Sequence, residues 1–264
     1  MTRDRVATGE AARILGVATA TVQRWVDFGI LDAERTAGGH RRISLAEVRR
    51  YIASSRKSDL PEPLQTWLEC LLSGEEREIR AEMLAVRRHR LSWAQMADEL
   101  ASVLVELGRR WEVGDCLIFE EHIATEALRR AAASCASDLP RSPGAPRVVM
   151  CSIPGERHQL GLSLAELVLA EAGWRVFFVG EGPPPGEIQK LLRKLRPSLI
   201  IVTGTSGISR VATRSYQKAW NASAAEHSAR LVLAGHAPWK PTPDTEFVQT
   251  FVGLSEFLNS TTFD

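Results

Sequence analysis

Apolar residues recur at spacings of three and four over much of the chain and in short continuous runs near its end. The first spacing places apolar side chains on one face of an α-helix, whereas a short continuous run is typical of a strand buried on both faces. Helical spacing fills the middle of the chain, and apolar runs alternate with helical stretches after Arg147. The pattern therefore predicts several domains of different architecture.

The last domain, residues 139–264, is predicted to be a parallel sheet. Five stretches are predicted to be buried strands: RVVMCSI, WRVFFVG, PSLIIVTG, RLVLAG and EFVQTFVG. Two amphipathic stretches among them, LGLSLAELVLAEAG and PGEIQKLLRKL, are predicted helices. Such alternation predicts a doubly wound, Rossmann-like α/β sheet, with ligands beyond the carboxyl ends of its strands. The first such end is the loop 154–161, PGERHQLG.

Residues 58–138 are predicted to form a four-helix bundle, because four successive segments show helical apolar spacing. The segments are 61–74, 75–90, 92–111 and 116–137. Trp111 is expected to end the third helix and Asp115 to cap the fourth, with Glu121 and His122 two turns inside it. Proline-containing linkers bound the bundle on both sides.

Residues 1–57 are predicted to form a winged helix-turn-helix. The stretch VATGEAARILGVATATVQRW contains two short helices, with Thr8 and Thr19 as expected N-caps and Gly16 at the turn. The following RTAGGHRR predicts a hairpin, because Gly38 and Gly39 permit a tight turn. Another amphipathic helix follows the hairpin.

The charge distribution points to a polyanionic partner for this first domain. It holds eleven Lys and Arg against six Asp and Glu, a net charge of +5, so the remainder of the chain sums to −4. A solvated basic loop is the alternative explanation for the wing alone, but a wing that follows a helix-turn-helix favours DNA. The residues expected to contact DNA are Thr19, Thr21, Gln23, Arg24, Arg35, His40, Arg41 and Arg42.

The overall composition is that of a soluble protein, with 44% hydrophobic and 25% charged residues. No apolar run is long enough to span a membrane, and the first ten residues lack the apolar core of a secretory signal. The four cysteines, Cys70, Cys116, Cys135 and Cys151, have no close pair. Free thiols and a cytoplasmic location are therefore expected.

The first domain resembles the DNA-binding module of MerR-family regulators. The resemblance rests on the helix-turn-helix followed at short range by the wing GGHRR, and it covers about residues 6–53. It implies double-stranded operator DNA as the partner, bound by a dimer or a higher oligomer of this chain.

The loop after the first predicted strand carries the pattern Glu156-x-His158-x-x-Gly161. A lone loop histidine is more often a bystander than a ligand, but this one lies where such sheets bind ligands. The pattern is similar to that of cobalamin-binding domains that take the cofactor base-off. By that resemblance His158 is the lower axial cobalt ligand, Glu156 orients its ring, and the nucleotide tail passes Gly161.

The third and fourth strand ends depart in part from that cobalamin-binding pattern. Thr203-Gly-Thr205 stands where the family has Ser-x-Leu, so Thr203 keeps the hydroxyl expected near the tail and Thr205 departs. Gly235-His236 stands where a Gly-Gly pair is usual. Gly235 keeps its place in the resemblance, and His236 is expected to narrow the channel for the tail.

The stretch WEVGDCLIFEEH, residues 111–122, can be explained without a ligand, as a packed helix hairpin with a solvated Glu121–His122 pair. A zinc site is disfavoured, because no second His or Cys lies at ligand spacing. However, Trp-x9-Glu-His in a bundle between a MerR-like module and a cobalamin domain is similar to the CarH/LitR-type photoreceptor repressors. The resemblance implies that Trp111, Glu121 and His122 cover the upper face of adenosylcobalamin, with methylcobalamin as the alternative.

Glu112 is the departure from this family that matters most. The best-known members have a histidine after that tryptophan, which can bind cobalt after photolysis. A carboxylate is a hard oxygen donor and a poor substitute for imidazole on cobalt. We therefore expect dark binding of the cofactor to survive and the photoproduct to differ, being ligated by water or by His122.

These resemblances predict a non-enzymatic repressor that senses light through adenosylcobalamin and releases DNA when its tetramer comes apart. Two alternatives stay open. A corrinoid carrier protein for methyl transfer would share the bundle and the histidine loop, but would have no use for a winged domain. A MerR-like regulator whose sensor binds another planar ligand or a partner protein is kept open by Glu112, Thr205 and His236.

Overall fold

The computed structural model describes residues 5–17, 19–27, 31–36, 38–55, 61–89, 92–243 and 245–263. The described chain divides into two compact units. The first combines Met1–Ser73 with Ser102–Ala124, and the second combines Gly74–Ala101 with Thr125–Asp264. The end of one helix hairpin thus belongs to the same unit as the N-terminal domain.

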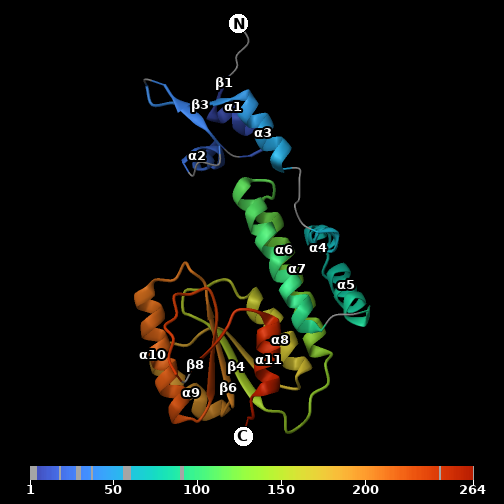
Figure 1. The fold of residues 1–264 in the computed structure, drawn as a ribbon, viewed down its shortest axis with the longest axis vertical. Helices are drawn as coiled ribbons and strands as arrows, with labels where there is room; N and C mark the ends of the chain where they lie inside the picture. Colours follow the sequence, from blue (N-terminus) through green and yellow to red (C-terminus); the bar gives the residue numbers. More distant parts are fainter. Residues whose placement is uncertain are drawn as a thin grey trace. The chain divides into compact units, whose positions relative to one another are not determined.

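The N-terminal part of the first unit is the predicted winged helix-turn-helix (Figure 1). Its helices are α1 (Thr8–Leu15), α2 (Thr19–Asp27) and α3 (Leu45–Ser55), and its strands are β1 (Arg5–Ala7), β2 (Ala33–Arg35) and β3 (Arg41–Ser44). The strands form an antiparallel sheet in the order β1-β3-β2, and the wing is the β2–β3 hairpin. Gly16 has a φ of 71°, the left-handed conformation expected at the turn between α1 and α2.

The two caps predicted in this domain are wrong. Ala7 is the N-cap of α1 and makes no side-chain cap hydrogen bond, whereas Thr8 already lies inside the helix. The reason is that β1, which was not predicted, pairs with β3 as far as Ala7, so the chain passes directly from strand to helix. Thr19 is the first residue of α2 rather than the residue before it.

Four helices follow, in agreement with the predicted bundle: α4 (Glu62–Ser73), α5 (Glu76–His89), α6 (Trp93–Val113) and α7 (Ile118–Ser137). The prediction that Asp115 caps α7 is wrong, because α7 begins at Ile118. The Leu117 N–H instead donates a hydrogen bond to Glu120 Oε2 at 2.7 Å. Glu121 consequently lies in the first turn of α7 and His122 directly after it, not two turns inside.

The second unit contains a five-stranded sheet in the order β5-β4-β6-β7-β8, and all four strand pairs are parallel. The strands are β4 (Arg147–Ser152), β5 (Arg175–Glu181), β6 (Leu199–Gly204), β7 (Arg230–Gly235) and β8 (Thr245–Val248). The helices are α8 (Leu160–Glu171), α9 (Pro185–Leu195), α10 (Arg210–Glu226) and α11 (Phe251–Ser260). This order is that of a doubly wound sheet.

Two apolar cores cover the two faces of this sheet (Figure 1). One joins α8 and α11 to the sheet through residues such as Leu169, Val148 and Leu254. The other joins α9 and α10 through residues such as Ile188 and Trp220. Burial on both faces explains why the central strands are continuous apolar runs in the sequence.

The prediction of five buried strands was wrong in two places. β5 is an edge strand, and none of its residues is fully buried. The fifth run, EFVQTFVG, is divided: β8 ends at Val248, and the Thr250 hydroxyl caps α11 by accepting a hydrogen bond from the Gly253 N–H. In the part of the chain that the structure describes, no helix has the length and apolarity needed to cross a membrane.

Candidate functional site

The most developed polar site of the second unit lies at the switch point of the sheet. β4 and β6 are neighbours, but the helix after β4 covers one face of the sheet and the helix after β6 covers the other. The two connecting loops therefore diverge at the carboxyl ends of these strands, where doubly wound sheets bind ligands. The predicted residues Glu156 and His158 lie in the first of these loops.

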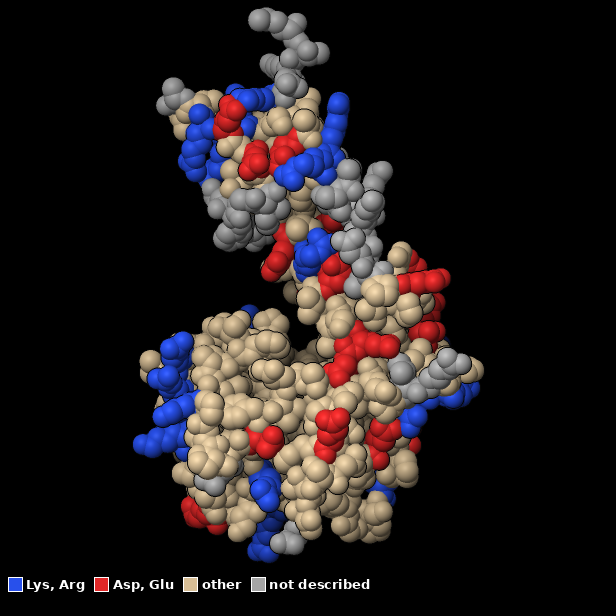
Figure 2. Space-filling view, in the orientation of Figure 1, with Lys and Arg blue, Asp and Glu red and all other residues tan. Residues whose placement is uncertain are grey.

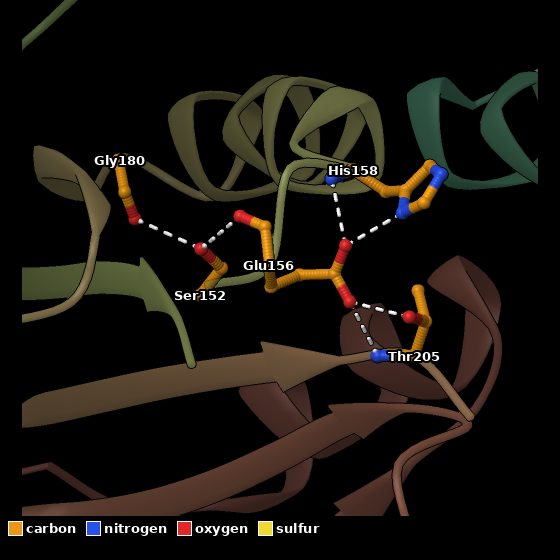
Figure 3. A network of polar contacts seen from close by, with 5 residues as sticks. All are labelled: Ser152, Glu156, His158, Gly180 and Thr205. Atoms are coloured by element: carbon orange, nitrogen blue, oxygen red, sulfur yellow. Dashed lines mark hydrogen bonds and ion pairs between the residues drawn. The ribbon is translucent and has the colours of Figure 1, made fainter. Parts of the chain in front are cut away.

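Glu156 holds His158 by two hydrogen bonds to the same carboxylate oxygen (Figure 3). Glu156 Oε1 accepts the backbone N–H of His158 at 2.8 Å and lies 2.6 Å from Nδ1 of the ring. The carboxylate side chain is 2% exposed, whereas the imidazole is 81% exposed. A buried anion thus fixes a ring that faces outward.

This contact decides which ring nitrogen is available to a ligand. When Nδ1–H donates to a carboxylate, the neutral imidazole carries its free lone pair on Nε2. The same arrangement, with a carboxylate behind the ring, orients metal-binding histidines and raises their basicity. His158 can therefore bind a metal ion held by a cofactor above the loop.

The second oxygen of Glu156 is held by Thr205, from the loop after β6 (Figure 3). Glu156 Oε2 accepts the Thr205 backbone N–H at 2.9 Å and the Thr205 hydroxyl. Burial raises the pKa of Glu156, but these bonds and those from His158 outweigh it and leave the pKa below its ordinary value. Glu156 is consequently an anion that spans the switch point.

The role of Thr205 was missed by the sequence analysis, which treated it only as a departure from a family pattern. The hydroxyl of Ser152 was also missed; it donates to the backbone carbonyls of Glu156 and Gly180 at 3.3 and 3.4 Å. The sequence did carry a signal for both residues: each of the neighbouring strands β4 and β6 is followed or ended by a residue with a hydroxyl group. The carboxyl ends of parallel strands meet at one edge of the sheet, so these hydroxyls could have been expected near the loop of Glu156.

Gly161 and Gly235 differ in the space around them. A Cβ on Gly161 would meet no atom within 4 Å, so the start of α8 is open to a bulky group. A Cβ on Gly235, which has a φ of 74°, would lie 2.5 Å from the Gly204 carbonyl oxygen and 2.9 Å from Thr203 Oγ1. Gly235 is thus needed for the approach of β7 to β6, and the neighbouring His236 is exposed.

The residues predicted to cover the ligand lie at the end of the α6–α7 hairpin, in the first unit. Trp111, in the last turn of α6, is 37% exposed. Glu121 Oε2 lies 3.5 Å from His122 Nε2, and the His122 side chain is 67% exposed. Glu112 is exposed, and its backbone carbonyl accepts a hydrogen bond from Trp25. Other large apolar residues exposed on this end are Leu117, Ile118, Phe119 and Ile123.

The residues predicted to contact DNA lie on α2 and on the wing. Thr19 and Gln23 are exposed on α2, and Val22 and Trp25 are buried on its other face. The side chains of Thr21 and Arg24 lie outside what the structure describes.

On the wing, Arg35, His40 and Arg42 are exposed, while Arg41 is half-buried. Gln23 lines the same pocket as His40, Arg41 and Arg42. Lys and Arg side chains gather on this domain in Figure 2. Helix and wing thus present polar and basic groups side by side, as a DNA-binding surface requires.

Comparison with known proteins finds family models for the first two parts of the chain. Residues 8–56 match a helix-turn-helix domain family, and residues 64–135 match a B12 binding domain family. The HTH-type transcriptional repressor CarH of Myxococcus xanthus is 26% identical over 241 residues, which span 78% of this chain and 78% of the repressor. These matches support a CarH-type transcriptional regulator with a helix-turn-helix domain and a B12 binding domain.

Two further comparisons agree with this regulator's architecture. The HTH-type transcriptional repressor CarA of Myxococcus xanthus is 27% identical over 104 residues, which span 39% of the regulator and 34% of CarA. The solved structure of the monomethylamine corrinoid protein of Methanosarcina barkeri is 12% identical with a TM-score of 0.55, over 74% of the regulator and 97% of that protein. The latter likeness shows that the fold is shared.

Proposed function

We propose that this regulator is a light-responsive repressor that binds adenosylcobalamin, and that its oligomeric state controls its binding to operator DNA. The observation that carries the proposal is the exposed imidazole of His158, held from behind by the buried carboxylate of Glu156 at the switch point. A protein with a DNA-binding domain and an oriented, outward-facing imidazole on a doubly wound sheet is suited to sensing a cobalt cofactor.

The residues of the sheet have distinct roles in this proposal. His158 Nε2 would bind the cobalt, and Glu156 keeps the ring in the tautomer that leaves Nε2 free. Gly161 would give the nucleotide tail room at the start of α8, and Thr203 and Gly235 lie at the carboxyl ends of β6 and β7, where the tail would approach the sheet. When bound, adenosylcobalamin supplies a cobalt–carbon bond that light breaks, so the chain needs no catalytic residue of its own.

The end of the α6–α7 hairpin supplies the cover for the upper face of the cofactor. Trp111 offers a flat apolar surface to the adenosyl group, and Glu121 and His122 offer hydrogen-bonding groups to its hydroxyls and to the corrin edge. The exposed apolar side chains of Ile118 and Phe119 are suited to the same cover. Burying an exposed apolar patch of this kind against a ligand lowers the free energy of the complex.

Control of DNA binding follows from the number of linked winged domains. Several domains joined in one oligomer bind an operator with an avidity that a single released chain lacks. Light would lower operator affinity by taking the oligomer apart, without any change in the contacts that each wing makes.

The first experiment uses the full chain reconstituted with adenosylcobalamin in the dark. We expect a coloured complex, a larger species by size-exclusion chromatography, and operator binding that green light abolishes. An elution volume unchanged by light would contradict the oligomer switch. Colour without DNA binding would favour a corrinoid carrier, and absence of colour would favour a sensor for another ligand.

Two histidine variants make the test specific. His158→Ala is expected to lower cobalamin affinity by about 100-fold or more. Loss even of a group that only orients a metal ligand costs about 10- to 100-fold in metal affinity. His89→Ala removes another exposed histidine, the last residue of α5, and is expected to keep the affinity within about threefold. Equal losses in the two variants would contradict the role of His158.

Glu112 is proposed to change the photoproduct. We expect the spectrum after illumination to lack the signature of two imidazole ligands, or to show one that depends on His122. Illumination of the wild-type chain and of His122→Ala distinguishes these cases. A stable two-imidazole spectrum that persists in His122→Ala would contradict both versions.

A further inference from the structure

The end of α6 is built into the core of the DNA-binding domain. Trp25, on the buried face of α2, is 1% exposed, and its Nε1–H donates a hydrogen bond to the Glu112 backbone carbonyl at 2.5 Å. Val113 packs against the same apolar core. α2 is the second helix of the helix-turn-helix, the one that reads bases in such domains. The base-reading helix is therefore attached to the helix hairpin through its own tryptophan.

Gly114 shows how closely the two parts fit. A Cβ built on Gly114 would lie 2.3 Å from Trp25 Cζ2 and 3.0 Å from Val17 Cγ1. Its φ of 80° is also in the left-handed region, which other residues rarely adopt. Glycine is thus the only residue that allows the turn after α6 to lie against the indole ring.

The indole of Trp25 is fixed from its other side within the DNA-binding domain. Its ring lies 4.9 Å from that of Tyr51 on α3, measured between centroids. A displacement of the turn at Glu112 and Gly114 therefore cannot be absorbed by a free side chain; it moves α2 relative to α3 or breaks the hydrogen bond.

Trp111, one of the residues proposed to cover the cofactor, adjoins the same turn. Trp111 directly precedes Glu112, so the side chain that would pack on the ligand and the carbonyl that holds Trp25 are one residue apart. The fraction of the hairpin that belongs to the first unit, Ser102–Ala124, includes both. A ligand that displaces the backbone at Trp111 would therefore also displace the Glu112 carbonyl that holds Trp25.

We propose that Trp25 and Gly114 are positioning residues that couple the cofactor-covering turn to the base-reading helix, so that cobalamin changes operator affinity within a single chain. The proposal rests on the proposed function, and it adds a second route of control to the oligomeric state. By linkage, DNA must change cobalamin affinity by the same factor, and such factors are typically about 5- to 150-fold.

The decisive variant is Gly114→Ala in the full chain, with Gly108→Ala as the matched control. Gly108 lies within α6, in the same hairpin as Gly114, but a Cβ there would meet no atom within 4 Å. Both variants and the wild type are titrated with a duplex selected from a random pool by the wild-type chain, with and without adenosylcobalamin in the dark. In the wild type and in Gly108→Ala, we expect the dissociation constants for the duplex with and without adenosylcobalamin to differ by a ratio of at least about five. In Gly114→Ala the ratio is expected to be smaller than in Gly108→Ala by about fivefold or more, since the oligomeric state is then the remaining route of control.

Nitrogen-15 labelling of the tryptophans gives a readout that needs no DNA. The indole N–H signal of Trp25, assigned with Trp25→Phe, is expected to shift on cobalamin binding in the wild type and to be displaced already in Gly114→Ala. Trp25→Phe itself keeps a ring beside Tyr51 but removes the donor to Glu112, so it is expected to lower the ratio without unfolding the domain.

Two results would overturn the coupling. One is a wild-type Trp25 signal that does not move although the absorption spectrum shows cobalamin bound. The other is a Gly114→Ala ratio equal to that of Gly108→Ala although the Trp25 signal is displaced. A wild-type chain whose spectrum shows no cobalamin binding would instead overturn the proposed function, and the coupling with it.

Discussion

Glu156 Oε1 lies 2.6 Å from His158 Nδ1, so a carboxylate that is almost fully buried holds an imidazole that is almost fully exposed. The anchor lies in the interior at the switch point, and most of the ring faces solvent. A ring held in this way loses little rotational freedom when its Nε2 binds a metal. The loop after β4 is therefore organised for a ligand by contacts that come from two strands.

Thr205→Val tests the part of this network that the sequence analysis missed. Valine keeps the shape of threonine but removes the hydroxyl that donates to Glu156 Oε2, while the Thr205 backbone N–H stays in place. The lost bond to a charged group is worth about 1.5–3 kcal/mol. We expect a cobalamin affinity about 10-fold lower, measured by titration followed by absorbance.

Thr205→Ser is the matched control, because it restores the hydroxyl at the same position. It is expected to bring the affinity back to within about threefold of the wild type. Equal affinities for the valine and serine variants would show that the hydroxyl of Thr205 does not position Glu156.

The order of strands and helices was predictable because parallel strands buried on both faces are continuous apolar runs. The runs at β4 and β6 and the amphipathic pattern of α9 confirm that prediction, whereas α8, predicted to be amphipathic, is buried on nearly all sides. The edge position of β5 was not predictable, because an edge strand in this sheet still carries apolar side chains on both faces, Phe178 and Val179 among them. An apolar run predicts a strand, but it does not show which strands lie beside it in the sheet.

The residues of the candidate site were predictable where a single loop carries them, as with Glu156 and His158. Contacts between segments far apart in sequence were not, and Thr205 lies 49 positions from Glu156. Trp25 and Glu112, separated by 87 positions, are the same case. The division of the chain into domains at residues 57 and 138 stays a prediction, as do the contacts of the predicted site residues with a ligand or with DNA.

Asp98→Ala tests why the last apolar run ends in a helix rather than in a strand. The Asp98 carboxylate, on α6, accepts the Phe251 N–H at 2.7 Å and the Val252 N–H at 3.0 Å, both in the first turn of α11. A negative charge at a helix N-terminus stabilises it through the free N–H groups and the helix dipole. We expect the variant to lower the free energy of unfolding of the second unit by about 1–2 kcal/mol.

The measurement is urea unfolding followed by circular dichroism. Asp98→Asn is the control, since its amide oxygen still accepts a hydrogen bond. It is expected to lower the free energy of unfolding by about half as much as Asp98→Ala does. An alanine variant as stable as the wild type would show that α11 is held by its apolar face alone.

The four cysteines, all in the described part of the chain, form no disulfide, and their thiols should differ in reactivity. Burial raises the pKa of the Cys151 thiol to about 12 and that of Cys135 to about 11. Because the thiolate is the nucleophile, a raised pKa lowers the reactive fraction at any pH below it. Cys70 is only half-buried. At pH 8 we expect iodoacetamide to modify Cys70 first, as followed by mass spectrometry of tryptic peptides.

The control for the order in which the cysteines react is the same reaction on the chain unfolded in urea, because burial then no longer protects any thiol. All four cysteines are then expected to react at similar rates. Modification of Cys151 as fast as that of Cys70 in the folded chain would contradict the burial of β4 on both faces.

Arg42→Ala tests the wing as a phosphate contact. Arg42 is exposed on β3 and lines the pocket that also includes Gln23 of α2. An arginine that neutralises one phosphate releases about 0.9 counterion, so its removal should reduce the slope of log affinity against log salt concentration by about one. We expect weaker binding to every duplex tested, with little change in sequence preference, because phosphates carry no sequence information.

Fluorescence anisotropy with a labelled duplex at several salt concentrations measures that slope. Lys190→Ala is the matched control, since Lys190 lies on α9 of the second unit and already pairs with Glu187 at 2.7 Å. Both variants remove one positive charge, so the net charge of the chain changes equally. If the slope falls by the same amount in both, the wing makes no specific phosphate contact, because a general charge effect then accounts for the loss.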